Sequence, residues 1–172
     1  DNEEYFKRRS LLHDEKGNCH KDNDERMIFF TKGVVETVKK LNWSPDLIHL
    51  HGWFTALFPL YLKYYFKDEP LFSESKVISS IYKPDFEGVF SKNFQEKVAF
   101  DAIDESIISE LKTANYEALT KLAIEFSDGL IMASEDLPET IVQQINSSKK
   151  PKLTYTESKN KEVYLKFYSD KF

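Results

Sequence analysis

The sequence predicts an α/β protein in which helices cover both faces of an open, mostly parallel sheet. Short apolar runs, typical of buried strands, alternate with longer segments whose apolar residues recur at helical spacing. Strands that alternate with helices pair in parallel through right-handed crossovers. With 172 residues, of which 41% are hydrophobic and 31% charged, the chain suits a single domain over residues 1–172.

The first long periodic segment predicts a helix over residues 23–41. Met27, Val34 and other apolar residues follow one another there at helical spacing. Asp22, with Glu25 three residues later, resembles a capping box, so both side chains are interpreted as capping groups.

Residues 47–51 form an apolar run that ends at His51 and Gly52, which predicts a buried strand followed by a turn. An aromatic helix is predicted over 53–66, a second strand over 76–82 and a long irregular connection over 83–104. The remaining predicted elements are one or two helices over 107–126, a strand over 129–133, a helix that Ser134 caps and that runs to about residue 145, a short strand over 153–155 and an amphipathic helix over 161–172 that uses Val163, Phe167 and Phe172.

Charge and composition exclude several classes of partner. The net charge of −5 and the pI near 5.5 argue against a nucleic-acid partner, since the basic pieces at residues 7–9 and 149–152 are short and are interpreted as solvated surface. Cys19 is the single cysteine, which favours a reducing, cytoplasmic compartment. The longest apolar stretch, residues 53–66, is too short to span a bilayer, so no membrane association is predicted.

The sequence nominates neither a cofactor nor a metal. Its five glycines are widely separated, which excludes a P-loop and a dinucleotide fingerprint from these residues. His13 and His20 flank Cys19 in a polar loop, where a chance cluster is the preferred interpretation over a metal site. His49 and His51 alternate along a strand and therefore face the same side, with His49 expected to be buried and hydrogen-bonded and His51 to face a cleft.

The carboxyl ends of the first two strands are where a ligand site is expected. In open parallel sheets, ligands bind at the edge where the strands end. His51, Gly52 and Trp53 follow the first strand, and Tyr82 and Lys83 follow the second. The aromatic residues after the first strand are interpreted as core rather than as a sugar platform, whereas both roles stay open for Trp53.

Several short motifs, in order along the chain, resemble the N-terminal Rossmann-like domain of bacterial glycogen synthases and plant starch synthases. The matching residues are Tyr5, Phe6 and Arg8 to Y-F-x-R; Asp22, Asn23, Glu25 and Arg26 to D-N-x-E-R; Pro45, Asp46, His49, His51 and Trp53 to P-D-[IV]-[IV]-H-x-H-D-W; Phe86, Gly88 and Phe90 to Y-Q-G-x-F; and Lys121, Asp128 and Ser134 to K-A-G, A-D and V-S. Each match alone is weak, but five in order are strong.

The resemblance implies a retaining glucosyltransferase that moves glucose from a nucleotide sugar, usually ADP-glucose, to an α-1,4-glucan. It implies no cofactor, and it places Arg8, Asn23 and Arg26 at a possible secondary cleft. Asn23 is more simply interpreted as a capping group than as a binding residue. For Arg26, contact with a ligand and pairing with a neighbouring carboxylate both stay open.

The sequence departs from the family pattern nearest the chemistry. Gly52 and Phe54 stand where the family has Asp and His, and Tyr82 and Lys83 replace the His-Asn pair that ends its next strand. Tyr82 retains a hydrogen-bonding group and Lys83 can meet a phosphate. The catalytic residues are therefore left unassigned.

Two pieces of the family pattern do not occur in this sequence. The K-[ST]-G-G-L loop after the first family strand is absent, and because the chain opens at Asp1 we expect it to lack the first strands of the domain. The terminal helix over 161–172 leads into no second, nucleotide-binding domain, so a partner domain or subunit is expected. Three interpretations stay open: a piece of a glucosyltransferase, a non-catalytic protein of that lineage that binds glycan or nucleotide sugar or assembles with a synthase, and an α/β domain of another activity.

Overall fold

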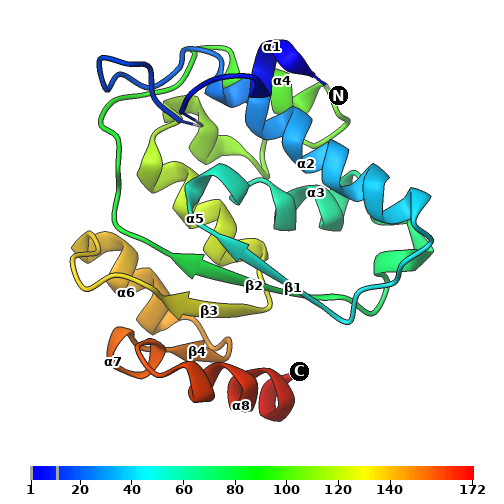
Figure 1. Cartoon of the computed structure of the whole chain (residues 1–172), viewed down its shortest axis with the longest axis vertical. Helices are drawn as coiled ribbons and strands as arrows, with labels where there is room; N and C mark the ends of the chain where they lie inside the picture. The colour runs from blue at the N-terminus through cyan, green and yellow to red at the C-terminus, as the bar shows by residue number, and fades with distance from the viewer. Residues whose placement is uncertain (1, 11) are drawn as a thin grey trace.

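The computed structural model describes residues 2–10 and 12–172 and has an open sheet of four parallel strands in the order β1-β2-β3-β4, with helices on both faces (Figure 1). The strands are β1 (Leu47–His51), β2 (Lys76–Ile81), β3 (Gly129–Met132) and β4 (Lys152–Leu153). The helices are α1 (Glu3–Phe6), α2 (Asn23–Lys40), α3 (Phe58–Tyr64), α4 (Phe94–Ala99), α5 (Tyr116–Phe126), α6 (Glu139–Ser147), α7 (Tyr155–Ser158) and α8 (Lys161–Lys171). The predicted fold class is confirmed.

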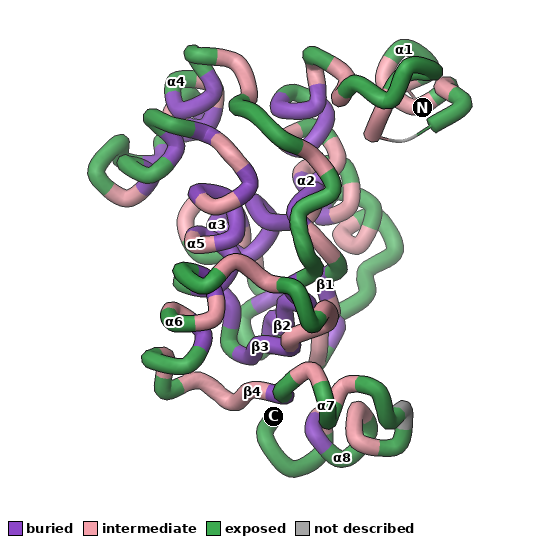
Figure 2. The backbone as a smooth tube through the Cα atoms, turned by 90° about the vertical axis from the view of Figure 1, so that its left-hand side faces the viewer, coloured by how far each residue is buried: buried purple, intermediate pink, exposed green. Residues whose placement is uncertain are grey.

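Side-chain alternation divides the strands between two apolar layers. Val77 and Leu130 belong to the main core, to which α2, α3, α5 and α6 contribute. Their strand neighbours Ile78 and Ile131 point to the opposite face, where they pack with Phe167 of α8. Figure 2 shows the buried residues gathered around β2 and β3, and α8 exposed along most of its length. The sheet is therefore thickly covered on one face and covered by a single long helix on the other.

The segment after β1 is less regular than the predicted helix over 53–66. A 3₁₀ turn over Trp53–Thr55 comes first, and α3 begins only at Phe58. Pro59 lies in the first turn of α3, where its missing N–H is harmless. A helix continuous from Trp53 would need that N–H for its hydrogen-bond ladder, so the proline separates the two pieces.

The connection predicted as irregular over 83–104 contains a helix. In α4, Phe94 and Val98 are fully buried against the main core. The segment over 107–126 resolves into two pieces, a 3₁₀ helix over Ser109–Thr113 and α5. Asn115 separates them as the cap of α5, where its side chain accepts a hydrogen bond of 2.9 Å from the amide of Ala118.

The predicted cap at Ser134 is wrong. The helix that follows β3 is α6, and it begins at Glu139 after Pro138. A residue that precedes proline is disfavoured in the helical region, so Pro138 sets the start of α6 and leaves Ser134 in the connection. The predicted strand over 153–155 is likewise shorter, because α7 already begins at Tyr155.

Two lysines of the basic stretch 149–152 have a structural role rather than the solvated one predicted. Lys152 donates to the carbonyls of Ile145, Asn146 and Ser148 at the end of α6, at 2.7–3.0 Å. Lys150 donates to the carbonyls of Ile124 and Glu125 at the end of α5. Cations are favourable at helix C-termini because they satisfy free carbonyls and oppose the helix dipole.

Within the residues that the structure describes, no helix is long and apolar enough to cross a membrane. Cytoplasmic location stays a prediction from the sequence.

The docking of α8 depends on Phe167, whose side chain is 5% exposed and packs on Ile78, Ile131 and Leu153. Replacing Phe167 by Ala should lower the free energy of unfolding by about 3 kcal/mol, because the cavity loses the contacts of a whole ring. The measurement is urea unfolding followed by circular dichroism. Leu165→Ala, at a position of the same helix that is 73% exposed, is the control and should change stability little. Equal effects of the two substitutions would contradict the observed packing.

Candidate functional site

Five residues predicted for the cleft line one cavity of 430 Å³ at the carboxyl edge of the sheet. They come together because β1 and β2 are parallel neighbours with His51 in register with Ser80, so the chain leaves both strands at the same edge. The lining consists of the predicted His51, Gly52, Trp53, Tyr82 and Lys83, together with Leu12, Phe54, Asp85 and Ser134.

Gly52 forms the turn that leads out of β1. Its amide donates to the carbonyl of Ser80 at 3.1 Å, which extends the pairing of the strands by one residue. Its backbone angles, φ 74° and ψ 176°, fall in a region that is essentially restricted to glycine. A Cβ atom would have space, with Tyr82 Cδ2 the nearest atom at 4.0 Å, so only the backbone conformation selects glycine here.

Trp53 is part of the core and part of the cavity wall at once. Its side chain is 6% exposed and packs against Phe86 and Phe90, with ring centroids 4.6 and 5.5 Å away. Its Nε1 donates a hydrogen bond of 2.5 Å to Oδ1 of Asp85. Trp53 thereby fastens the segment after β2 to the turn after β1. Asp85 was not predicted for the site, because nothing in the sequence marks a carboxylate in an irregular segment as the partner of an indole.

His49 and His51 lie on the same face, as predicted, with their ring centroids 4.2 Å apart. His49 contacts the Ser80 hydroxyl through Nε2 at 2.8 Å and the Tyr168 hydroxyl through Nδ1 at 2.7 Å. Burial, with a smaller contribution from His51, lowers the pKa of His49 to about 4. His49 is therefore neutral at pH 7.

His51 faces the cavity and contacts the hydroxyl of Tyr82 through Nδ1 at 3.0 Å. Partial desolvation lowers the pKa of His51 and raises that of Tyr82, so both are neutral near pH 7. Lys83 adds a cation to the same lining. A neutral imidazole, a phenol and an ammonium around one cavity can exchange hydrogen bonds with hydroxyl groups and attract a phosphate.

The three residues predicted for a secondary cleft gather at the start of α2. Arg8 forms a bidentate pair with Asp22, at 2.9 and 2.6 Å, so Asp22 makes no side-chain cap and the predicted capping box is wrong. Glu25 also turns away from the helix end and accepts hydrogen bonds from Tyr5 and Lys97.

Arg26 is fully buried. Its hydrogen-bond partners are neutral groups, whereas a carboxylate was one of the partners considered from the sequence. Its Nε donates to the carbonyl of Tyr5 at 2.9 Å and its Nη1 to Oδ1 of Asn23 at 2.5 Å, while its guanidinium lies 5.7 Å from the ring of Phe54. Asn23 in turn donates to the carbonyl of Leu12 at 3.0 Å. Asn23 and Arg26 therefore support the cavity wall through Leu12 and Phe54, and neither of them lines the cavity.

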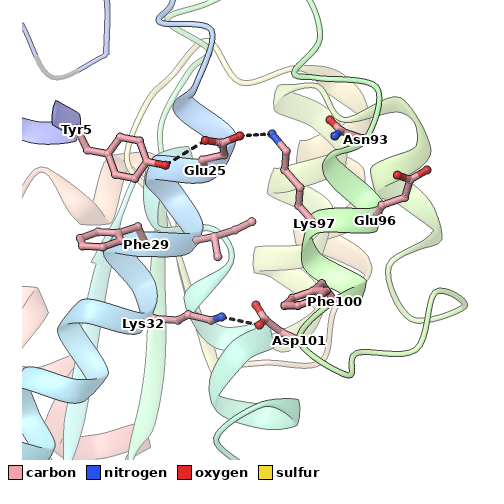
Figure 3. A pocket seen from close by; sticks show the side chains of 10 residues that line it. Tyr5, Glu25, Phe29, Lys32, Asn93, Glu96, Lys97, Phe100 and Asp101 are labelled. Atoms are coloured by element: carbon pink, nitrogen blue, oxygen red, sulfur yellow. Dashed lines mark hydrogen bonds and ion pairs between the residues drawn. The ribbon is translucent and has the colours of Figure 1, made fainter. Parts of the chain in front are cut away.

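A second hollow of 570 Å³ lies between α2 and α4 (Figure 3). Ion pairs bridge it, with Lys97 and Glu25 2.8 Å apart and Lys32 and Asp101 2.5 Å apart. Phe100, 91% exposed, stands at its rim. These four charged groups already pair with one another across the hollow. Among the described residues, no cluster of three or more His, Cys, Asp and Glu side chains could hold a metal ion.

Comparison with known proteins assigns the family. The family model described as the starch synthase catalytic domain matches residues 1–150. The chain belongs to this glycosyltransferase family. No solved structure is significantly similar to the chain.

Bacterial glycogen synthases are similar over most of these residues. The chain is 34% identical to the glycogen synthase of Chlorobium phaeobacteroides over 142 residues, which are 81% of this chain and 28% of that protein. It is 33% identical to that of Pelodictyon phaeoclathratiforme over 143 residues, 82% of this chain and 28% of that protein. With the enzyme of Chlorobaculum tepidum the identity is 42% over 108 residues, 60% of this chain and 22% of that protein. The chain thus matches between 22% and 28% of the length of these relatives.

Family membership gives the cavity its context. The likeness is therefore one of family and goes beyond the fold alone. The strand-end motif from Pro45 to Trp53 and the segment after β2 lie within the matched residues, whereas α8 lies beyond them.

Gly52→Ala should destabilise the chain by about 1–3 kcal/mol, because alanine is strained at the backbone angles of this turn. Gly33→Ala is the matched control: Gly33 is exposed inside α2, nothing lies within 4 Å of its added Cβ, and alanine there should stabilise by up to about 1 kcal/mol. Urea unfolding measures both. Stabilisation by Gly52→Ala would contradict the conformation observed for the turn.

The low pKa of His49 predicts a pH dependence of stability. The unfolded chain binds a proton at His49 near pH 6.5, whereas the folded chain does so only near pH 4. Stability is therefore complete above pH 6.5 and falls as the pH decreases toward 4, with a loss of about 1–2 kcal/mol from this group between pH 7 and 5. Urea unfolding over that range should show a flatter dependence for His49→Gln than for the wild type. The same slope in both would refute this assignment.

Proposed function

We propose that the chain forms the acceptor-side half of a glucosyltransferase cleft that takes glucose from a nucleotide sugar, ADP-glucose, and faces an α-1,4-glucan. The observation that carries the proposal is the single cavity lined by His51, Gly52, Trp53, Tyr82 and Lys83. It lies at the carboxyl edge of a parallel sheet, where α/β proteins bind ligands. The glycogen synthases that resemble the chain support the substrate class.

The other wall of the cleft would come from a partner domain or subunit. The cavity is lined by groups suited to hydroxyls and by one cation, Lys83. A nucleoside diphosphate carries several negative charges, so further basic groups would have to meet it from the opposite side. β1 pairs with one described strand, β2, and its other edge is open. That edge supports the expectation of a preceding strand in the complete domain.

A second candidate, a non-catalytic protein that binds glycan or nucleotide sugar, is favoured by Gly52. The backbone of Gly52 is one that an aspartate, the family residue at this position, would adopt only with strain. At this position the cavity therefore lacks the family carboxylate that could fix a sugar hydroxyl. Under this proposal the chain holds a sugar in the cavity without transferring it.

Binding to the cavity is tested by amide chemical-shift changes in the chain during titration with ADP-glucose and, separately, with maltoheptaose. Residues 51–53 and 82–83 should respond first. Tyr82→Phe should weaken binding about fivefold, the size of one net hydrogen bond. Tyr65→Phe is the control, because Tyr65 is 43% exposed and Tyr82 40%, and Tyr65 does not line the cavity.

Lys83→Met distinguishes the two ligands, since it should weaken binding of the charged ADP-glucose and leave binding of the neutral glucan nearly unchanged.

Transfer of labelled glucose to glycogen by the full-length protein then separates the two candidate functions. Transfer supports the glucosyltransferase, and glucan retention without transfer supports the binding protein. Shifts confined to residues outside the cavity would refute both.

A further inference from the structure

The sheet face that carries His49 and His51 is covered by α8, which lies beyond the residues that the family model matches. Figure 1 shows α8 across the face of the sheet opposite α2, α3 and α5. Phe167 fixes this position from the middle of the helix. Phe172 fixes its end, because the ring lies where a Cβ on Gly129 would be, 2.5 Å from its Cζ. The register of α8 against the strands is therefore set at two points.

In this register, two tyrosines one turn apart on α8 face β1. The ring centroids of Tyr164 and Tyr168 lie 6.0 and 5.8 Å from that of His49. Of these two tyrosines, only Tyr168 places its hydroxyl on an imidazole nitrogen, 2.7 Å from Nδ1 of His49. Among the described residues, the hydroxyl of Tyr164 makes no hydrogen bond to either histidine.

We propose that Tyr168 is a positioning residue for the candidate cleft and acts through His49 on His51. A neutral imidazole has one donor and one acceptor nitrogen. With Ser80 at Nε2 and Tyr168 at Nδ1, both nitrogens of His49 are engaged, which holds the orientation of its ring. The phenol of Tyr168 is a stronger acid than the Ser80 hydroxyl and therefore the better donor, so it favours the tautomer in which Nδ1 accepts and Nε2 carries the proton.

The fixed ring of His49 limits where the ring of His51 can lie. The centroids of the two rings lie 4.2 Å apart. On its other side, His51 shares a hydrogen bond between its Nδ1 and the hydroxyl of Tyr82. A chain of contacts thus runs from α8 to the cavity: Tyr168, His49, His51 and Tyr82. Since the His51–Tyr82 bond uses Nδ1, the Nε2 of His51 is the nitrogen left to meet a ligand.

Side chains from three elements surround the ring of His49, and Tyr168 is the one that contacts its Nδ1. β2 contributes the Ser80 hydroxyl, β1 contributes His51, and α8 contributes Tyr164 and Tyr168. If the Tyr168 hydroxyl is removed, Nδ1 of the half-buried His49 loses its hydrogen-bond partner. The free-energy cost of that unsatisfied nitrogen favours a flip of the ring or an exchange of tautomer. His51 would lose its fixed neighbour at the same time.

The experiment is nitrogen-15 NMR of the imidazole rings in the whole chain at pH 7, without ligand. The wild type should show a single tautomer for His49 and for His51. Tyr168→Phe, which keeps the ring that packs on the sheet, should give a mixture of tautomers at His49 and move the ring resonances of His51. Tyr164→Phe is the matched control, with the same chemical change on the same helix, and should leave both histidines unchanged. Unfolding and amide exchange of α8 verify that both variants keep the helix docked.

Ser80→Ala removes the other hydrogen bond of His49 but leaves Tyr168 at Nδ1, so it should move the Nε2 resonance of His49 without giving the mixed tautomer of Tyr168→Phe. The proposal is overturned if His51 responds equally to Tyr168→Phe and Tyr164→Phe, or to neither of them.

The consequence for ligand affinity rests on the proposed function. Tyr168→Phe should weaken maltoheptaose binding about threefold, with Tyr164→Phe unchanged. If no sugar binds but the histidine resonances respond as expected, the proposed function fails and the positioning role stands. If sugar binds with equal affinity to both variants and His51 does not respond, the positioning role fails alone.

Discussion

The parallel pairing of β1 with β2 is the constraint on which the rest of the structure depends. It places His51 beside Ser80, and the amide of Gly52 continues the pairing by bonding to the carbonyl of the same serine. Both chain segments that follow must then start from one edge of the sheet. A slip of one residue would turn His49 and His51 to the opposite face, into the layer of Val77 and Leu130. The candidate cavity exists because that register is kept.

Buried polar groups support this edge from outside the sheet. The guanidinium of Arg26 is desolvated, which lowers its pKa, and two of its nitrogens donate to the carbonyl of Tyr5 and to the side-chain amide oxygen of Asn23. Arg8 and Asp22 form their ion pair nearby, and the charges of both act on Arg26. A buried polar group costs free energy when it loses its hydrogen bonds. These contacts therefore hold the N-terminal segment in one place. The resemblance associates Arg8, Asn23 and Arg26 with a cleft, and in the structure they form the frame beside one.

The family membership and the local chemistry carry different information about function. The match over residues 1–150 establishes descent, while the cavity presents a glycine turn, a phenol and a lysine. Function depends on the site rather than on the fold. The family has aspartate where this chain has Gly52. The difference is more than the loss of a carboxylate, because the backbone angles of Gly52 are strained for any residue with a Cβ atom.

The sequence by itself determined where the strands lie, because Leu47–His51, Lys76–Ile81 and Gly129–Met132 each combine apolar runs with local breaks. It also determined the edge at which His51, Gly52, Trp53, Tyr82 and Lys83 meet, since topology alone brings the ends of adjacent parallel strands together. Pro59 and Pro138 carried the signal for two helix starts that the periodicity obscured. Only the tertiary structure decided the partners: Asp22 with Arg8 rather than a helix end, Trp53 with Asp85, and His49 with Tyr168, which lies 119 residues away. Hydrogen bonds between distant side chains depend on which faces pack together, and local spacing in a sequence contains no record of that choice.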